Sequence, residues 1–486
     1  ARDAAAVLLA RLLTRPGLQP ALSDFVAWSV AELDAAASSS AAAAAPSALS
    51  TSFLVAGVHT ALAHIFKLGH RSDLLGQLPR LGPLSSGAHE LLASNSVTKR
   101  KLGIKLLQRV GLVYLPPRVA SWRYQRGNRS LLHNLQASGA PTEGTADADA
   151  GAAPAPAEEE DEEEGEEALV AEEVEGVLEQ LLTGLKDADT VVRWSAAKGV
   201  GRLTGRLPLE LADDVVEQVL ELLTPDETPN SWHGGCLALA ELSRRGLLLP
   251  ARLPEVLPRV TKALHFDVAR GASSVGTHVR DAACYVTWAF AREFEPAVMA
   301  PHVAALAPAL LVLVVFDREV NVRRAAAAAF QEHVGRQGSF PHGIEIVTRA
   351  DYFAVGSRVA CYLEIAPWLA TFEAYRMPLL RHLCDVKSRH WDESLRLLSA
   401  KAAARLAPLE AEWVVATMIP DLCGRALSPD LKERHGATHM AAEVLLGVAN
   451  AAHGGDGGKF PPETRKQVGG LVPAIEKARL YRGRGG

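Results

Sequence analysis

Four stretches of this chain repeat one phrase, in which a carboxylate is followed by an arginine and then by apolar residues at helical spacing. The stretches cover residues 189–203, 317–334, 392–406 and 430–444. One helical unit restated along a chain is typical of a solenoid of stacked repeats, where each unit buries its apolar face on its neighbours. The pattern therefore predicts an extended helical-repeat protein rather than a globular enzyme.

Register and repeat length support the same fold. Two copies share five offsets: Asp189, Arg193, Lys198, Arg202 and Leu203 in one, and Asp392, Arg396, Lys401, Arg405 and Leu406 in the other. Arg280 and Arg323 are 43 positions apart, which lies within the roughly 40–47 residues of a two-helix HEAT or armadillo unit. An Asp four residues before the Arg suits a helix N-cap, because its carboxylate can accept from free amides of the first turn. We expect an all-α, HEAT/armadillo-like solenoid.

The acidic residues are concentrated in one segment. Residues 151–175 hold 12 carboxylates and no Lys or Arg, so the rest of the chain carries a formal charge of +7, against -5 for the whole. Residues 137–167 consist mainly of Ala, Pro, Gly and acid, which offer too little apolar surface to offset the entropy of ordering. We expect a disordered acidic loop there, between N-terminal helical repeats over 1–136 and a HEAT-repeat solenoid over 168–486.

Two roles are open for the acidic loop. Such charge blocks are commonly solvated tethers, here between repeats. Alternatively, the loop lies intermittently across a basic surface of the solenoid and competes with an acidic partner, an effect that salt would screen.

Cysteine usage and hydropathy indicate the compartment. Five cysteines lie far apart, without the paired spacing of zinc sites or the dense framework of disulfides, at Cys236, Cys284, Cys361, Cys384 and Cys423. We therefore expect reduced thiols and a cytoplasmic protein. The longest apolar run, 303–316, is too short for a bilayer and contains Pro308, so it predicts a buried helix and no membrane span. No signal peptide is visible; the chain starts at Ala1, so we expect a piece of a longer protein.

No compact catalytic signature is present. Three glycines resemble a phosphate loop superficially but follow no strand and have the wrong spacing, so close helix packing explains them better: Gly199, Gly201 and Gly205. His435 and His439 stand one helical turn apart with Glu443 after them, yet Gly436 occupies the place of the glutamate in a zinc hydrolase motif. We expect no catalytic, cofactor-binding or metal-binding residues.

The repeated arginines allow two interpretations. In the first, they form a ladder in which each pairs with an acid of its own or the adjacent repeat. In the second, some of them belong to a surface that binds a partner, together with Trp194, Lys198 and Arg202, because Trp and Arg concentrate binding energy while Lys adds steering. Trp194 could equally be a wedge between repeats.

A second candidate for recognition is the Gly- and Pro-rich stretch 335–343, which should end the helix begun at Val322. Loops on a rigid repeat scaffold often carry recognition, although this one could simply redirect the superhelix. The candidate partner-binding residues are Arg193, Trp194, Lys198, Arg202, Arg280, Arg323, Arg324, Phe340, His342, Arg396 and Arg434.

Long stretches go beyond the general repeat pattern. They begin at Asp187 (DADTVVRWSAAKGVGRLTGRLP), Ser231 (SWHGGCLALAELSRRGLLLP) and Phe316 (FDREVNVRRAAAAAFQEHVGRQGSFPHG), and further ones at Val119 (VASWRYQRGNRSL), Arg280 (RDAACYVTWAFAR), Ala350 (ADYFAVGSR) and Ser428 (SPDLKERHG). These stretches resemble the tubulin-folding cofactor D family. The resemblance covers nearly the whole chain except the acidic loop, which in that family is a variable acidic insertion.

The resemblance implies a HEAT-repeat chaperone, associated with the microtubule cytoskeleton, that receives β-tubulin after chaperonin release and joins it to α-tubulin carried by cofactor E. It also implies that the assembly, together with cofactor C, stimulates GTP hydrolysis on β-tubulin, and that an Arf-like small GTPase is a partner. We expect a scaffold rather than an enzyme, without cofactor or nucleic acid. The alternatives are a HEAT-repeat transport or coat adaptor and a stand-alone GTPase activator.

Overall fold

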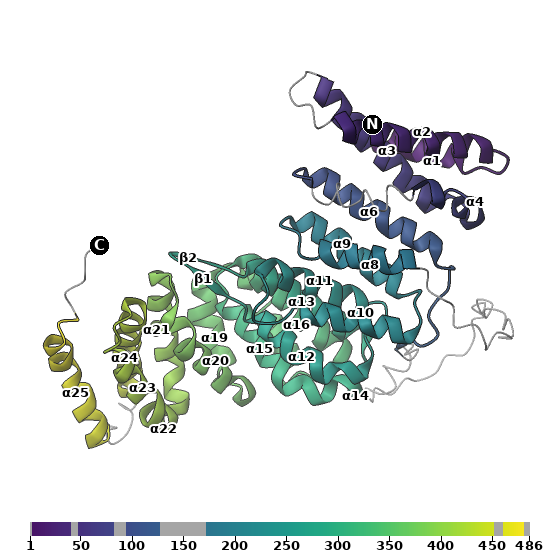
Figure 1. The fold of residues 1–486 in the computed structure, drawn as a ribbon. Coiled ribbons are helices and arrows are strands. Elements are labelled where there is room, and N and C mark those ends of the chain that lie inside the picture. The colour runs from purple at the N-terminus through teal and green to yellow at the C-terminus, as the bar shows by residue number, and fades with distance from the viewer. Residues whose placement is uncertain (1, 40–46, 82–93, 127–171, 452–459, 481–486) are drawn as a thin grey trace, which may run out of the picture.

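The computed structural model describes residues 2–39, 47–81, 94–126, 172–451 and 460–480. Within them, helices stack side by side from the N-terminus to the C-terminus into one elongated, bent array (Figure 1). The predicted all-α helical-repeat solenoid is confirmed for this part of the chain. The predicted acidic loop over 137–167 lies outside the described residues, so the division into 1–136 and 168–486 stays a prediction.

The N-terminal helices are α1 (Arg2–Leu13), α2 (Gln19–Ser39), α3 (Ser47–Leu68), α4 (Arg71–Leu75) and α6 (Val97–Tyr114). Helix α6 joins two apolar clusters. Leu106 and Val110 pack towards α3, whereas Ile104 and Leu107 belong to the core of the following repeats. The apolar core is therefore continuous from α6 into the repeats that follow.

From α8 onward the helices form two layers. The first layer contains α8 (Glu172–Gly184), α10 (Leu209–Glu221), α12 (Leu253–Leu264), α15 (Val303–Phe316), α20 (Glu373–Asp385) and α23 (Ile419–Arg425). The second layer contains α9 (Thr190–Thr204), α11 (Pro229–Ser243), α13 (Thr277–Glu293), α16 (Val320–Gln337), α21 (Glu393–Leu406) and α24 (Leu431–Ala451). Short helices connect them: α14 (Pro296–Met299), α17 (Gly343–Arg349), α18 (Arg358–Ala360), α19 (Ala366–Leu369) and α22 (Ala411–Trp413), and α25 (Pro462–Lys477) follows.

Sequence spacing explains the two layers. Helix α10 buries Ala212, Val215, Val216, Val219 and Leu220, the i, i+3, i+4, i+7 and i+8 positions of a helix with one apolar face. Helix α11 is instead buried from Ser231 to Ser243, as befits a helix enclosed between neighbours in its own layer and in the other. Small residues, including Gly234, Gly235 and Ala238, make that enclosure possible.

The predicted N-caps are confirmed at three second-layer helices. The carboxylate of Asp189 accepts from the amide of Val191 at 2.8 Å, and that of Asp392 accepts from Ser394 at 2.9 Å. Asp430 accepts from Lys432 at 2.7 Å. Each carboxylate satisfies an amide that has no partner within its helix, which fixes where the helix begins.

The predicted break after α16 is also confirmed. Gly338 adopts a left-handed conformation with φ +63°, and its amide donates to carbonyls of the last turn of α16. Such a cap is accessible to glycine because it lacks a Cβ atom. His342 is left-handed as well, with φ +53°, and α17 begins directly after it.

Residues 296–316 are long and apolar enough, by composition alone, to cross a membrane. In the structure, however, this stretch is divided between α14, a 3-10 turn and α15, and residues 309–316 are all buried against neighbouring helices. Its apolarity is that of a core helix, as the sequence predicts. All five cysteines are buried too, in α11, α13, α20, α23 and the turn Cys361–Ile365.

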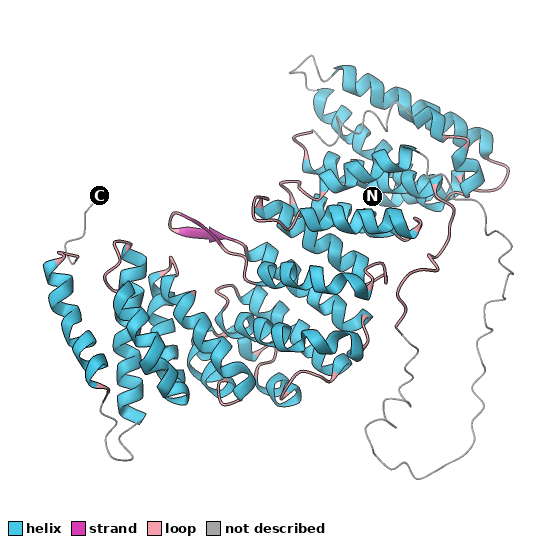
Figure 2. Cartoon of the chain, turned by 60° about the horizontal axis from the view of Figure 1, so that its bottom comes forward, coloured by secondary structure: helices cyan, strands magenta, loops and turns pink. Residues whose placement is uncertain are grey.

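Three features were not predicted from the sequence. A β-hairpin of β1 (Val268–Arg270) and β2 (Ser273–Val275) precedes α13, with Val268 opposite Val275. It projects on the inner side of the bend (Figure 2). Two wide, π-helical turns, Cys361–Ile365 and Val414–Met418, interrupt helices of the C-terminal repeats. Residues 115–126 leave α6 without regular structure and run along the outer edge of the bend.

Candidate functional site

The repeated arginines lie behind the loops that lead into the second-layer helices. In each of four copies, Nη1 donates to the carbonyl oxygens six and five residues earlier: Arg193 to Asp187 and Ala188, Arg323 to Asp317 and Arg318, Arg396 to His390 and Trp391, and Arg434 to Ser428 and Pro429. The planar guanidinium suits this role because its N–H groups point in fixed directions. The motif closes one loop after another in the same way.

The predicted ladder of ion pairs is therefore wrong in its chemistry for most copies. Among the described residues, Arg193, Arg323 and Arg396 show no ion pair, because carbonyl oxygens already occupy their donors. Arg280 is the exception: its Nε lies 2.6 Å from Asp317 Oδ2 and its Nη1 lies 3.3 Å from Asp267 Oδ1. The β-hairpin is inserted in the loop before α13, and Arg280 binds one carbonyl of that loop, that of Phe266 at 2.8 Å, in addition to these two acids.

Burial separates these arginines from the exposed candidates. Arg193 and Arg323 are only 3% and 2% exposed, and Arg280 and Arg396 are buried as well. Burial lowers the pKa of Arg193, and its Nε donates to Nδ1 of His233, whose pKa burial lowers to about 3. These buried guanidinium groups hold loops together and do not form an exposed contact surface.

Phe340 was expected in an exposed recognition loop, and this expectation is wrong. Its ring is 5% exposed and stacks on His333 with 4.7 Å between ring centroids, because the chain after Gly338 turns back onto α16. His342 remains exposed and stacks on Phe372 at 4.3 Å. Arg324 lies over the ring of Tyr352 at 4.5 Å, beside the exposed loop that follows α17.

The structure places Trp194, Lys198 and Arg202 along one face of α9, as their helical spacing predicts. The ammonium of Lys198 lies 5.5 Å from the centroid of the half-buried Trp194 ring. Arg202 donates from Nη1 to Gln108 Oε1 of α6 at 3.3 Å. These three side chains are thus accessible on the second layer, where a partner could reach them.

Aromatic residues of α13 continue this face, and sequence reasoning did not single them out. Tyr285 lies 5.5 Å from the Trp194 ring and 5.8 Å from the Trp288 ring, and Arg292 lies over Trp288 at 4.7 Å. Trp194 and Tyr285 meet across α11, which lies between α9 and α13. The signal was present in the sequence, because positions 285, 288 and 292 follow the i, i+3, i+7 spacing of one helix face.

A buried carboxylate anchors the middle of this face. Glu241 of α11 is fully buried and accepts from Arg245 and from Arg244, the latter at 3.3 Å. The hydroxyl of Tyr285 lies 3.4 Å from the same carboxylate. Because two arginines share one acid, the group keeps a net positive charge at the surface.

We name these residues the cation–aromatic stripe: Lys105, Arg109, Trp194, Lys198, Arg202, Glu241, Arg244, Arg245, Tyr285, Trp288, Arg292, Glu332 and Arg336. Eight members are cations and two are carboxylates. Burial and then the charge of Arg202 lower the pKa of Arg109 to about 10, and burial and then the nearby Arg245 lower the pKa of Arg202. Such an array favours an acidic, partly apolar protein surface, with cations for steering and aromatic rings for contact.

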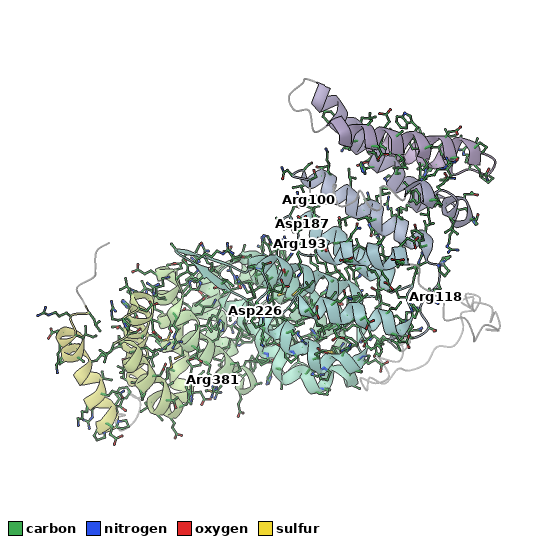
Figure 3. All side chains as sticks on the ribbon, viewed as in Figure 1. Arg100, Arg118, Asp187, Arg193, Asp226 and Arg381 are labelled. Atoms are coloured by element: carbon green, nitrogen blue, oxygen red, sulfur yellow. The ribbon has the colours of Figure 1, made fainter. Side chains whose placement is uncertain are left out.

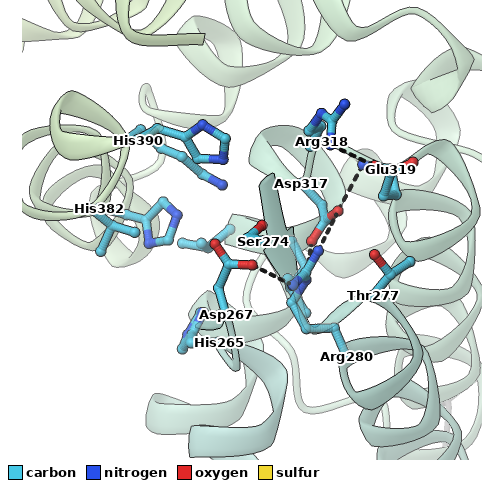
Figure 4. Close-up of a pocket in the computed structure, with 14 residues that line it drawn as sticks. His265, Asp267, Ser274, Thr277, Arg280, Asp317, Arg318, Glu319, His382 and His390 are labelled. Carbon is cyan, nitrogen blue, oxygen red and sulfur yellow. Dashed lines mark hydrogen bonds and ion pairs between the residues drawn. The ribbon is translucent and has the colours of Figure 1, made fainter. Parts of the chain in front are cut away.

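The recess in Figure 4 offers less chemistry. It is lined by His265, His382, His390, Lys387, Arg280 and Asp317, among others, and its volume of about 50 Å³ is far below the roughly 300 Å³ of typical ligand pockets. Burial lowers the pKa of His265 and of His390 to about 4 in each case, so both rings are neutral at pH 7. Arg280 is engaged by its two aspartates. This seam between repeats has room for water but not for a nucleotide.

The histidine pair of α24 has a structural use. Nδ1 of His435 accepts from Nε of Arg396 at 3.2 Å, and a Cβ atom on Gly436 would lie 1.7 Å from the carbonyl oxygen of Ser388. A glycine is thus required at position 436, because α24 approaches the backbone at Ser388 closely. Within the described residues, no three His, Cys, Asp or Glu side chains are grouped as metal ligands.

Figure 3 shows the edges of the stack that these features occupy. Arg100, Asp187 and Arg193 lie together at one edge, and Arg118 lies at the opposite edge. Arg100 of α6 pairs with Asp187 at 2.7 Å, an ion pair between neighbouring repeats. The loops that these arginines hold together therefore lie at the edge of the stack where the second-layer helices begin.

The chain is similar in sequence to known proteins. A family model described as "Tubulin-specific chaperone D-like, ARM repeats" matches residues 98–344, just over half of the chain. Tubulin-specific chaperone D of Dictyostelium discoideum is 38% identical over 458 residues, which are 92% of this chain and 30% of that protein. Tubulin-folding cofactor D of Schizosaccharomyces pombe is 29% identical over 371 residues, which are 73% of this chain and 31% of that protein. The chain thus spans less than a third of the length of these relatives.

Among solved structures, yeast importin-β is similar over 96% of this chain and 50% of its own, with a TM-score of 0.43 and 13% identity.

Proposed function

The chain belongs to the tubulin-specific chaperone D family, and we propose that it is part of a tubulin-folding chaperone that holds β-tubulin after its release from the chaperonin. The match of the family model to residues 98–344 carries this proposal. The names of the two relatives supply tubulin as the client. Because the chain spans only about 30% of their length, the share of the work done by these repeats is itself part of the proposal.

A physical mechanism follows from the solenoid and the stripe. A tubulin monomer exposes the surface that the heterodimer buries, and an apolar surface of that kind aggregates unless it is covered. An extended stack of repeats can cover such an area with many modest contacts. The cations of the stripe attract an acidic client and speed the encounter, while Trp194, Tyr285 and Trp288 supply apolar contact.

The wider assembly rests on the family resemblance. We propose that the chain acts in the cytoplasm as a scaffold that joins β-tubulin to α-tubulin carried by cofactor E. In that proposal, cofactor C and this chain together promote GTP hydrolysis on β-tubulin, and an Arf-like small GTPase is a further partner. The chain contributes surfaces to this process rather than catalytic groups. Trp194, Lys198, Arg202, Arg324, His342 and Arg434 remain the proposed contact residues, because they are at least partly exposed.

The experiment that tests the client is charge reversal on the stripe. In the double variant Lys198→Glu, Arg202→Glu, we expect capture of β-tubulin to weaken about tenfold or more at low salt, and the difference to shrink as salt screens the charges. The matched control is Arg259→Glu, Lys262→Glu on α12, which reverses two accessible cations of the first layer. Wild-type affinity across the whole salt series would refute the assignment of the stripe.

A second variant separates contact from steering. Trp194→Ala removes apolar surface without changing charge, so we expect an affinity loss of roughly tenfold that persists at high salt. If the loss instead disappears with salt, Trp194 acts only by positioning Lys198. If neither variant affects β-tubulin while other repeats of the chain crosslink to it, the client lies on another surface.

A further inference from the structure

Residues 115–126 form a strap across four repeats. Helix α6 ends before Pro116 and Pro117, which cannot continue a helix because they lack an N–H group. The chain then crosses the ends of α9, α11, α13 and α16 in turn, along the outer edge of the bend (Figures 1 and 2). A segment that follows one edge of the stack touches repeats that do not touch one another.

The strap is bonded at every helix that it crosses. Nε of Arg118 donates to the carbonyl of Arg206 at 3.1 Å, and Nε1 of Trp122 donates to Leu207 at 3.1 Å, both just after α9. The amide of Tyr124 donates to the carbonyl of Gly246 after α11 at 2.8 Å. These acceptors belong to helix ends, where carbonyls lack partners within the helix.

The far end of the strap bridges two more helices. Nη1 of Arg126 lies 3.0 Å from the carbonyl of Ala291 and 2.9 Å from that of Arg292, in the last turn of α13. Nη2 of the same guanidinium lies 3.0 Å from the carbonyl of Arg336 in α16. A cation at the C-terminal end of a helix is also favoured by the helix dipole. One side chain thus links helices whose residues lie 165 to 210 positions away in the sequence.

The backbone around the strap is fitted to it. Gly246 has φ +72°, and a Cβ atom there would lie 2.1 Å from the carbonyl oxygen of Tyr124. The ring of Tyr124 packs on Phe294 with 5.4 Å between centroids, and its hydroxyl accepts from the amide of Glu295 at 3.2 Å. The strap therefore packs into the surface of the repeats, in close contact with their backbone and side chains.

The strap includes one turn between its anchor points, where the amide of Arg123 donates to the carbonyl of Ala120 at 3.4 Å. From Arg118 to Arg126 the chain makes eight Cα-to-Cα steps, which reach about 29 Å at most when fully extended. The three steps from α9 to α16 amount to about 24–30 Å at usual distances between helix axes. Bending the stack more sharply would move the outer helix ends apart, so the bonds that the strap makes at its successive crossings would have to break.

We propose that residues 115–126 act as a tether that holds α6 to α16 at one curvature, so that the solenoid changes shape in the repeats beyond α16. The proposal rests on these contacts alone and is independent of the identity of the client. The end of the strap at α16 marks the border between the two behaviours. Beyond α16, one side-chain bond reaches back as far: Nζ of Lys432 in α24 donates to the carbonyl of Gly271 in the β-hairpin at 3.4 Å, through a partly exposed lysine rather than a backbone segment.

The test is release of the strap in the whole chain by Tyr124→Ala with Arg126→Ala. Hydrogen exchange should accelerate together in the last turns of α11, α13 and α16, by about tenfold or more, while α21 and α24 are unchanged. The pair-distance distribution from small-angle X-ray scattering should shift at the same time. Arg259→Ala is the matched control, because within the described part of the chain the side-chain hydrogen bonds of Arg259 go to Glu255 of its own helix.

Two results would overturn the proposal. Exchange in the three turns could match that of the control variant, or it could rise while the scattering profile stays that of the wild type, which would make the strap a local cap. If the double variant does not fold, Trp122→Phe serves instead, because it keeps an aromatic ring and deletes only the bond to Leu207. That variant should accelerate exchange after α9 and at the next crossing, and acceleration after α9 alone would contradict a shared tether.

Discussion

The repeats from α6 to α16 and those beyond α16 share the arginine-closed loop but differ in how they are joined. In the first region, a strap bonds helices that are not neighbours, and α11 is buried along most of its length. In the second, π-helical turns interrupt helices, and α25 buries only Thr464 among its 16 residues. One family of repeats can therefore supply both a stiff platform and a more compliant arm, depending on what crosses its edges.

The largest expected effect on stability comes from replacing the repeated arginine of the loop motif, at one position in each region. Arg323 is buried and donates to four carbonyls, so Arg323→Met should lower the free energy of unfolding by about 3 kcal/mol, since those acceptors lose their donor. Arg434 is half-buried and donates to two carbonyls, so Arg434→Met should cost about 1 kcal/mol. Urea unfolding measures both values. Equal losses would mean that burial does not distinguish the two regions.

Acid should lower the free energy of unfolding of the strapped region by protonating His333. Burial lowers the pKa of His333 to about 4 from 6.5, so the unfolded chain binds a proton that the folded chain does not bind. Its contribution is fully present above pH 6.5 and is lost as the pH falls towards 4, by about 2 kcal/mol at pH 5.

The measurement is urea unfolding between pH 7 and pH 5 for the wild type and for His333→Phe. The variant cannot take up this proton, so its stability should depend less on pH, even though it loses the bond from Nε2 to the carbonyl of Thr287. An unchanged slope in the variant would assign the acid sensitivity to other histidines.

Amide exchange compares the two regions directly. Helix α11 is enclosed, whereas α25 rests on α23 through one face, so protection in α11 should exceed that in α25 by about a hundredfold or more. Hydrogen exchange of the unmodified chain gives both rates. Similar protection in the two helices would remove the contrast between platform and arm.

The smallest effect concerns the acidic segment. If residues 137–167 compete for the cation–aromatic stripe, their deletion should raise affinity for an acidic client severalfold at low salt and leave it unchanged at high salt. A neutral Gly/Ser segment of equal length is the control, because it preserves the connection without the charge. Unchanged affinity at low salt would leave the segment as a tether.

Much of the fold was predictable because its signals are local. The N-caps at Asp189, Asp392 and Asp430 and the helix end at Gly338 each depend on residues within one or two turns. The arginine register was equally clear. The bonding partners of these arginines were not predictable. A carboxylate near an arginine in the sequence suggests an ion pair, and it does not reveal that the N–H groups of the arginine donate to loop carbonyls.

The strap and the full stripe lay beyond sequence reasoning for a different reason. Trp122 and Arg126 bond to residues 85 to 210 positions away, and no periodicity within a helix reports such contacts. Trp194 of α9 meets Tyr285 of α13 across the intervening helix α11, an arrangement that no single helix pattern reports. The β-hairpin was not predicted, because two strands of three residues each are too short to show the alternation of apolar and polar residues that indicates a strand.

The buried cysteines give the chain a set of built-in reporters. Cys236 and Cys284 lie in the strapped repeats, and Cys361, Cys384 and Cys423 lie beyond them. Burial raises the pKa of every one of these thiols, to about 12 for Cys236 and to about 11 for Cys361. A thiol-specific reagent can therefore modify each position only while its own repeat is open, so alkylation followed by mass spectrometry would time the breathing of this solenoid segment by segment without any added label.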